Sequence, residues 1–149
     1  MNSYPNVYFQ NQVGTASREQ LLIMLYDGAI LFLRQARQAM ENGERIVKIE
    51  KIGKVVNILT ELSNTLDFEN GGEIAEQLDS VYWYMIRELI RSNTQDDPEP
   101  LMVAERILQE LRDGWVQAIE QNRPAPKAVA GYEPNGEAVL ETRPISGAV

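Results

Sequence analysis

The chain has 149 residues, of which 44% are hydrophobic and 24% are charged. These proportions are typical of a soluble globular protein and too apolar for a disordered one. The formal net charge is -8 at neutral pH, so a basic nucleic-acid-binding surface is not expected. Cysteine and histidine are absent, which excludes disulfides, zinc sites with Cys or His ligands, and Ser-His-Asp triads.

The N-terminus has no basic segment followed by an apolar run, so we expect no secretory signal. No apolar stretch approaches the roughly 20 residues that are needed to span a bilayer. The sequence therefore predicts a cytosolic protein.

Residues 1–16 are expected to form a docking segment, because they combine aromatic and aliphatic side chains with no charged one. Large apolar side chains left exposed commonly mark a contact surface. The alternative is an ordinary frayed terminus. The side chains that we expect to cover an apolar surface are Tyr4, Val7, Tyr8 and Phe9.

Four segments show apolar residues at helical spacing, with short connections between them. The first begins at Ser17, which forms a capping-box pattern with Gln20, and ends at Asn42-Gly43. The second is expected over about 44–66. The third is expected over 73–93, after a break at 67–72. For the fourth, Asp96-Asp97-Pro98 reads as N-cap and first turn, with its end near Gln121.

Short connections require neighbouring helices to run antiparallel, so we predict an all-α, up-and-down four-helix bundle over residues 17–122. Residues 123–149 hold four of the seven prolines, and we expect them to form a flexible tail. In the second helix the expected core stripe is Ile49, Ile52, Val56, Leu59 and Leu66.

Enzymatic and metal-binding functions find little support in the residues. Di-metal sites in helical bundles use Glu-x-x-His pairs, and this chain has no histidine. Glu73 and Glu76 stand in the predicted first turn of a helix, where acidic residues are favoured by the helix dipole. No glycine-rich phosphate loop accompanies Gly71-Gly72. We therefore expect no catalytic residue, no cofactor and no metal.

The second and third helices carry more apolar residues than one core-facing stripe requires. One explanation is a wide core, or a lid made by the docking segment or the tail. The other is a hydrophobic groove between these helices that receives a partner helix, because apolar anchors spaced three, four or seven residues apart are typical of such grooves. The expected groove residues are Val55, Ile58, Leu62, Trp83, Ile86 and Ile90.

Three stretches follow one another in order along the chain: the run from Thr15 to Ile30, the run from Gly71 through Met85, and Leu108-Gln-Glu-Leu-Arg-Asp-Gly-Trp115. Together they resemble the FliS family of flagellin-specific export chaperones. The resemblance covers about residues 4–120. One departure is Arg18, where the family usually has proline after Thr-Ala-Ser; proline pre-sets the first helical turn, so its loss affects the start of the first helix.

The resemblance implies a four-helix bundle that binds the disordered C-terminal segment of flagellin in apolar grooves. It implies that binding prevents premature polymerisation and that the client is delivered to the cytoplasmic domain of the flagellar type III export gate. It also implies that tyrosines of the N-terminal segment, here Tyr4 and Tyr8, help to cover the binding surface. We expect a monomer that forms a 1:1 complex with its client.

One alternative is a structural bundle that self-associates through the same apolar surface and has no client. A stable dimer at micromolar concentration would indicate that reading.

Overall fold

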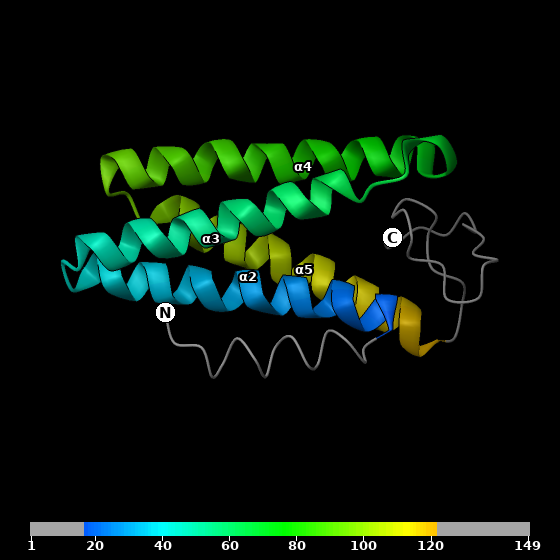
Figure 1. The fold of residues 1–149 in the computed structure, drawn as a ribbon, viewed down its shortest axis with the longest axis horizontal. Helices are drawn as coiled ribbons and strands as arrows, with labels where there is room; N and C mark the ends of the chain where they lie inside the picture. Colours follow the sequence, from blue (N-terminus) through cyan, green and yellow to red (C-terminus); the bar gives the residue numbers. More distant parts are fainter. Residues whose placement is uncertain (1–16, 122–149) are drawn as a thin grey trace.

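The structure is a computed structural model that describes residues 17–121, in which four helices account for nearly every residue. They are α2 (Arg18–Glu41), α3 (Arg45–Asn64), α4 (Phe68–Gln95) and α5 (Glu99–Glu120). The expected docking segment (residues 1–16), with Tyr4, Val7, Tyr8 and Phe9, lies outside the described residues. The expected tail (residues 123–149) lies outside them too. The predicted all-α four-helix bundle is confirmed (Figure 1).

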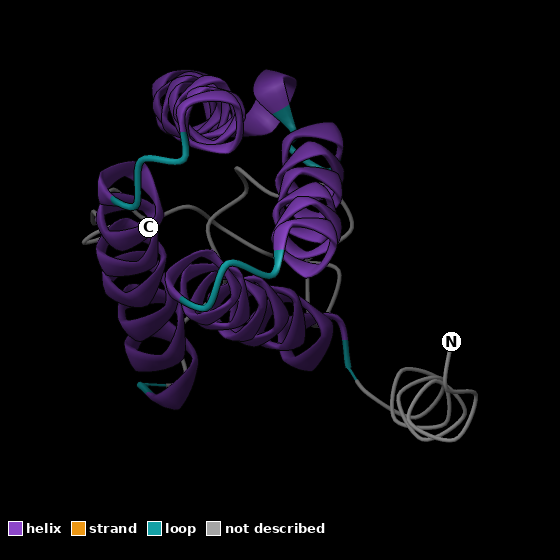
Figure 2. Ribbon diagram, turned by 90° about the vertical axis from the view of Figure 1, so that its left-hand side faces the viewer, coloured by secondary structure: helices purple, strands orange, loops and turns teal. Residues whose placement is uncertain are grey.

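The helices form a closed ring in chain order, because each packs against its sequence neighbours and α5 returns to pack against α2. Each of the three connections contains three residues, 42–44, 65–67 and 96–98. Connections of this length leave no room for a crossover, so adjacent helices run antiparallel. Figure 2 shows the four helices surrounding a common interior.

The start and end of α2 follow the sequence prediction. The Ser17 hydroxyl accepts a hydrogen bond from the Gln20 backbone N–H at 3.1 Å, and the Gln20 side chain accepts one from the Ser17 N–H at 2.9 Å. At the other end, Asn42 caps the helix and Gly43 takes a positive φ of 72°. Arg18 therefore replaces the usual proline without loss of the capping box.

Three aromatic side chains share hydrogen bonds inside the core. The Tyr26 and Tyr82 hydroxyl oxygens lie 2.6 Å apart, and the Trp115 indole N–H donates to the Tyr26 oxygen at 3.1 Å. All three residues are buried. Because they come from α2, α4 and α5, these bonds fix the relative positions of three of the four helices.

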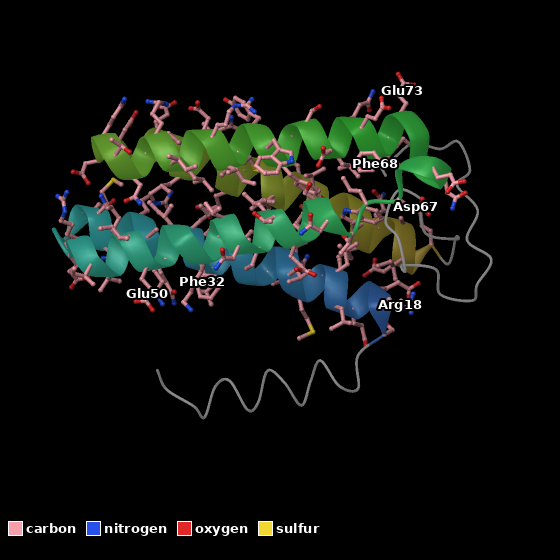
Figure 3. All side chains as sticks on the ribbon, turned by 45° about the horizontal axis from the view of Figure 1, so that its top comes forward. Arg18, Phe32, Glu50, Asp67, Phe68 and Glu73 are labelled. Atoms are coloured by element: carbon pink, nitrogen blue, oxygen red, sulfur yellow. The ribbon has the colours of Figure 1, made fainter. Side chains whose placement is uncertain are left out.

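The third helix begins earlier than predicted, at Phe68 rather than at Glu73. Asp67 is its N-cap and accepts a hydrogen bond from the Asn70 N–H at 3.1 Å. The glycines do not end a helix here. Instead, Gly72 takes φ 53° and ψ -124° and kinks α4 after its first turn, a conformation that is open only to glycine. Figure 3 shows Asp67 and Phe68 at this end of the bundle, with Glu73 beyond the kink.

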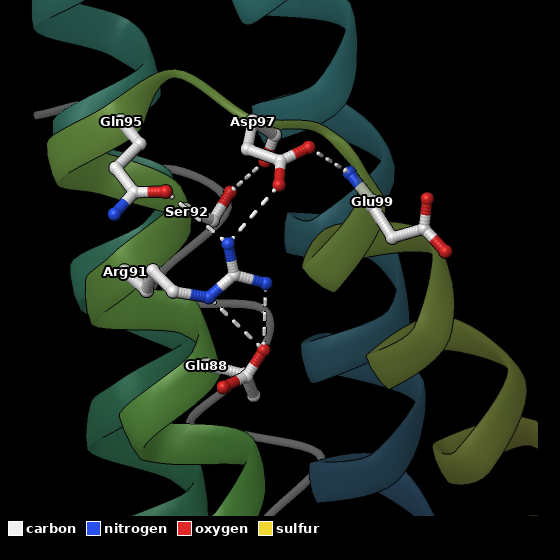
Figure 4. A network of polar contacts seen from close by, with 6 residues as sticks. All are labelled: Glu88, Arg91, Ser92, Gln95, Asp97 and Glu99. Carbon is white, nitrogen blue, oxygen red and sulfur yellow. Dashed lines mark hydrogen bonds and ion pairs between the residues drawn. The ribbon is translucent and has the colours of Figure 1, made fainter.

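The connection between α4 and α5 also differs from the prediction. Asp96 is not the N-cap of α5; it closes α4 in the left-handed conformation, at φ 54°. Asp97 accepts a hydrogen bond from the Glu99 N–H at 3.0 Å, while Pro98 stands at the N-cap position. Figure 4 shows how Arg91 joins this corner, through Asp97 at 3.2 Å and Glu88 at 2.8 Å.

Lys48 is a buried cation that the sequence analysis did not identify. Its ammonium donates to the Asn93 carbonyl at 3.0 Å and to the Asp96 carboxylate at 2.5 Å. The hydrogen bond and charge of Lys48 lower the pKa of Asp96 below its ordinary value. This contact ties the start of α3 to the end of α4.

Candidate functional site

Two polar contacts define the side of α3 that faces α4. Lys48 contacts the last turn of α4 at one end, and the Ser63 hydroxyl donates to Asp79 at the other. Residues seven apart share one side of a helix. Val56 and Ile49, seven and fourteen residues before Ser63, therefore lie along the seam between α3 and α4.

The facing side of α4 is located in the same way from Asp79. Trp83, Ile86 and Ile90 follow Asp79 by four, seven and eleven residues, which places them on one side of the helix. Trp83 is 43% exposed and Ile90 is 55% exposed, whereas Ile86 is only 4% exposed. Ile86 thus forms the floor between two exposed apolar side chains.

We call this surface the α3–α4 strip: it consists of Ile49, Val56, Trp83, Ile86 and Ile90. Ile49 is 44% exposed, and Val56 is half-buried against the core. Antiparallel packing from the Ser63–Asp79 contact places Val56 near the level of Ile86, and Ile49 near that of Asn93, about one turn beyond Ile90. The strip is an elongated apolar surface rather than a deep pocket, which suits an extended or helical segment more than a small molecule.

The structure places the six predicted groove residues in three different environments. Trp83 and Ile90 are exposed on the strip. Ile86 is buried beneath them. Val55 and Leu62 are fully buried in the core, so the expectation that they stand beside the core stripe is wrong. Ile58 points to another seam: its Cδ1 lies 3.6 Å from the position that a Cβ on Gly28 of α2 would occupy.

The mistake on α3 has a physical cause. This helix carries apolar residues on most of its sides, so the sequence pattern does not select one phase. Ile49 and Val56 were expected in the core and lie on the strip, while Val55 and Leu62 were expected on the groove and lie in the core. Lys48 hides the correct phase, because it shares a side with the buried Ile52 and Val55 and is itself buried, whereas a lysine in a sequence normally marks a solvent-facing side.

A second surface lies on the opposite side of α3, against α2. The ammonium groups of Lys51 and Lys54 stand 5.3 Å and 5.7 Å from the centre of the Phe32 ring, within the range of cation–π attraction. We call Phe32, Lys51, Lys54 and Ile58 the α2–α3 seam. Figure 3 shows Phe32 here with Glu50 of α3 nearby, at the opposite end of the bundle from Phe68 and Glu73.

A small cavity of about 240 Å³ opens between α4 and α5, beside the polar network of Figure 4. Tyr84, Arg91 and Glu99 are among its lining residues. Arg91 and Glu88 in this lining pair with each other, and the Glu99 carboxylate is the one charged group of the lining outside that pair, so the cavity presents no convergent set of unsatisfied groups that would point to a small-molecule ligand.

Within residues 17–121, no three acidic side chains gather closely enough to hold a metal ion. None of the helices in that part of the chain combines the length and the apolar character required to cross a membrane.

Comparison with protein families gives the decisive observation. The family model described as flagellar protein FliS matches residues 1–122, which include the whole bundle. The chain belongs to the FliS family. This result confirms the resemblance inferred from the three sequence stretches.

Curated members of the FliS family share about a third of their residues with this chain. The flagellar secretion chaperone FliS of Bacillus subtilis is 38% identical over 116 residues, covering 78% of this chain and 86% of the relative. The Vibrio cholerae protein of the same name is 34% identical, with the same coverage. The flagellar secretion chaperone FliSB of Pseudomonas aeruginosa is 38% identical, over 77% of this chain and 91% of the relative.

The FliS family is thus a family of flagellar secretion chaperones, and a chaperone requires a protein client. A client-binding surface on this bundle has to be apolar and accessible. Of the surfaces described above, the α3–α4 strip meets both conditions over the greatest length.

Proposed function

We propose that this chain is a cytosolic flagellar export chaperone that binds the C-terminal segment of flagellin along the α3–α4 strip. Its role is to prevent premature polymerisation and to deliver the client to the cytoplasmic domain of the flagellar type III export gate. Family membership supports the chaperone role. The observation that carries the choice of surface is the exposure of Trp83 and Ile90 on either side of the buried Ile86.

A long, shallow apolar strip fits a client that is disordered before it binds. Such a client loses conformational entropy when it becomes ordered, so it needs contacts spread over a large area rather than one deep pocket. Aromatic side chains commonly supply most of the energy at interfaces of this kind. We therefore infer that Trp83 is the principal anchor and that Ile90 is the second.

The direct test is calorimetric titration of the full chain with the C-terminal segment of the host flagellin. We expect a 1:1 complex and a negative heat-capacity change, because apolar surface is buried and the client folds on binding. Absence of heat at several temperatures, with the chain folded, would contradict the proposal. A dimer in light scattering that Trp83→Ala converts to monomer would favour the self-associating bundle.

Substitutions on the strip locate the binding surface. Trp83→Ala and Ile90→Ser should each weaken binding about tenfold or more, because each removes an exposed anchor. Met102→Ser on α5 is a matched control, since Met102 is 43% exposed, as Trp83 is; it should leave binding unchanged. Equal losses for strip and control variants would show that the strip is not the site. Ile86→Asp is unsuitable as a binding variant, because burying a carboxylate there would unfold the helix pair.

The N-terminal docking segment is proposed to cover the strip when no client is bound, through Tyr4, Val7, Tyr8 and Phe9. A covering segment competes with the client and lowers its apparent affinity. Deletion of residues 1–14 should therefore strengthen flagellin binding or leave it unchanged. Markedly weaker binding of the deleted chain would show instead that the segment contacts the client.

A further inference from the structure

The α2–α3 seam is a basic and aromatic surface on an acidic molecule. Helix α3 carries Arg45, Lys48, Lys51 and Lys54 within ten residues, against two acidic side chains in the whole helix. By contrast, α4 and α5 each carry five acidic and two basic side chains. Of the four described helices, α3 alone has more basic than acidic side chains, in a chain whose net charge is -8. Of its cations, Lys51 and Lys54 lie on the seam, whereas Lys48 is buried against α4.

Lys51 and Lys54 differ from most of the other cations of the bundle in their partners. Arg34 and Arg37 pair with Glu105, Lys48 pairs with Asp96, and Arg112 pairs with Asp27. Lys51 and Lys54 form no ion pair with any described residue, and the Phe32 ring is their shared contact. Glu50 stands four residues before Lys54 and does not pair with it. The seam therefore offers two ammonium groups and an aromatic ring to a further group of opposite charge.

We propose that residues 132–141 of this chain dock on the α2–α3 seam, with their glutamates on Lys51 and Lys54 and their apolar side chains on Phe32. This segment, Tyr-Glu-Pro-Asn-Gly-Glu-Ala-Val-Leu-Glu, contains Glu133, Glu137 and Glu141, and no basic residue lies between 128 and 142. Tyr132 and Leu140 supply the apolar contacts. The N-terminal segment, which has no charged side chain, offers nothing to the two lysines.

The connecting chain is long enough for this docking. Trp115 bonds to Tyr26, and α5 runs antiparallel to α2, so the end of α5 lies near the level of residue 21. Phe32 is then about 17 Å farther along α2 at 1.5 Å per residue, and the path must also round one helix of about 10 Å diameter. Residues 121–131 span up to about 36 Å when extended, which covers the distance.

Docking of residues 132–141 occupies a different seam from the one proposed for the client. Binding at the α3–α4 strip and docking at the α2–α3 seam are on opposite sides of α3, so the second does not depend on the first. The tail lies beyond residue 122, where the match to the FliS family model ends. The proposed docking segment therefore lies outside the part of the chain that matches the family model.

The experiment uses a paramagnetic label on the full chain, which has no cysteine of its own. A spin label on Asn135→Cys should cause a loss of amide peak intensity confined to residues near Phe32 and to 47–58 of α3. Amides on the outer side of α5, such as Arg106, should keep their intensity. The loss should disappear in Glu133→Gln/Glu137→Gln/Glu141→Gln, and in about 1 M salt, where the screening length falls to about 3 Å.

Lysine variants test the other half of the contact. Lys51→Gln/Lys54→Gln should abolish the loss, whereas Arg87→Gln/Arg106→Gln, which removes the same charge from α4 and α5, should not. Four results would overturn the proposal: a loss centred on another surface, an even loss over the bundle, no loss at all, or equal effects of the two double variants. Equal losses in a mixture of spin-labelled ¹⁴N chain with ¹⁵N chain that has no spin label would also overturn it, because that mixture detects only contacts between chains and the tail would then dock on a second copy.

Discussion

The hydroxyl of Tyr26 accepts the indole N–H of Trp115 and shares a hydrogen bond with the Tyr82 hydroxyl, all inside the core. A buried polar atom is tolerated only when it is hydrogen-bonded, because it has lost its water. Removing one member of such a set leaves the others without a partner and exposes the full cost of their burial. The network therefore favours one relative position of α2, α4 and α5.

Tyr26→Phe should lower the free energy of unfolding by about 1–3 kcal/mol, because both Tyr82 and Trp115 lose a buried partner. Urea unfolding, followed by circular dichroism, measures this change. Tyr84→Phe is the control, since Tyr84 is 43% exposed and should be nearly neutral. Equal effects of the two substitutions would mean that the buried network contributes no stability.

Within the helices, glycines occupy two opposite kinds of position. Gly53 lies in the middle of α3, and a Cβ added there would meet nothing within 4 Å. Gly72 also has open space, but its φ of 53° with ψ of -124° is strained for any L-residue. Space alone therefore does not decide what a substitution does; the backbone conformation does.

Gly53→Ala should raise the free energy of unfolding by about 0.5–1 kcal/mol, because alanine favours a helix interior. Gly72→Ala should lower it by about 1–3 kcal/mol, or straighten α4 and release Phe68 from its first turn. Thermal unfolding of the two variants side by side distinguishes these effects. Stabilisation by both substitutions would show that the kink in α4 is not needed for the fold.

For the molecule as a whole, the buried tyrosines set an upper pH limit on stability. Burial raises the pKa of Tyr26 from 10.0 to about 12, and burial also raises the pKa of Tyr82 well above 10.0. Because the pKa is raised in the folded state, the stability that the buried tyrosines contribute is fully present below pH 10, where these tyrosines are protonated in both the folded and the unfolded chain. This stability is lost as pH rises from 10 toward the pKa of the folded state, because in that range only the tyrosines of the unfolded chain ionise freely.

We expect the free energy of unfolding to fall between about pH 10 and 12, by roughly 3 kcal/mol for Tyr26 alone. Denaturant titrations at several pH values measure this slope. Tyr26→Phe/Tyr82→Phe should flatten it, and Tyr84→Phe should not. If the slope of the double variant matched that of the unchanged chain, lysine deprotonation rather than the buried tyrosines would account for the loss.

The parts of this fold that were predictable from sequence depend on local chemistry. Ser17 with Gln20 and Asn42 with Gly43 set the ends of α2 through contacts within a few residues. The roles of Asp96, Asp97 and Pro98 at the boundary between α4 and α5 were predictable only in part. An aspartate can either cap the start of one helix or close the preceding helix in the left-handed conformation. The packing of Lys48 against the Asp96 carboxylate determines which of these occurs, and that contact spans 48 residues.

The strip was predictable on α4 but not on α3. Helix α4 alternates strongly between an apolar and a polar side, so the positions of Trp83 and Ile90 followed from spacing. Helix α3 has apolar residues nearly all round, and its rotation is decided by partners on α2 and α4: Gly28 admits Ile58, and Asp79 accepts from Ser63. Neither partner is visible in the sequence of α3 itself.

The ring order of the helices has a consequence for folding during synthesis of the chain. Three of its four helix interfaces join consecutive helices, but the fourth joins the first described helix to the last. While the chain is being synthesised, the side of α2 that will receive α5 has no partner until residues 99–120 are made. Exposed apolar surface of that kind is what makes nascent chains aggregate. The side of α2 that receives α5 is therefore the surface most exposed to aggregation while this chain is being synthesised.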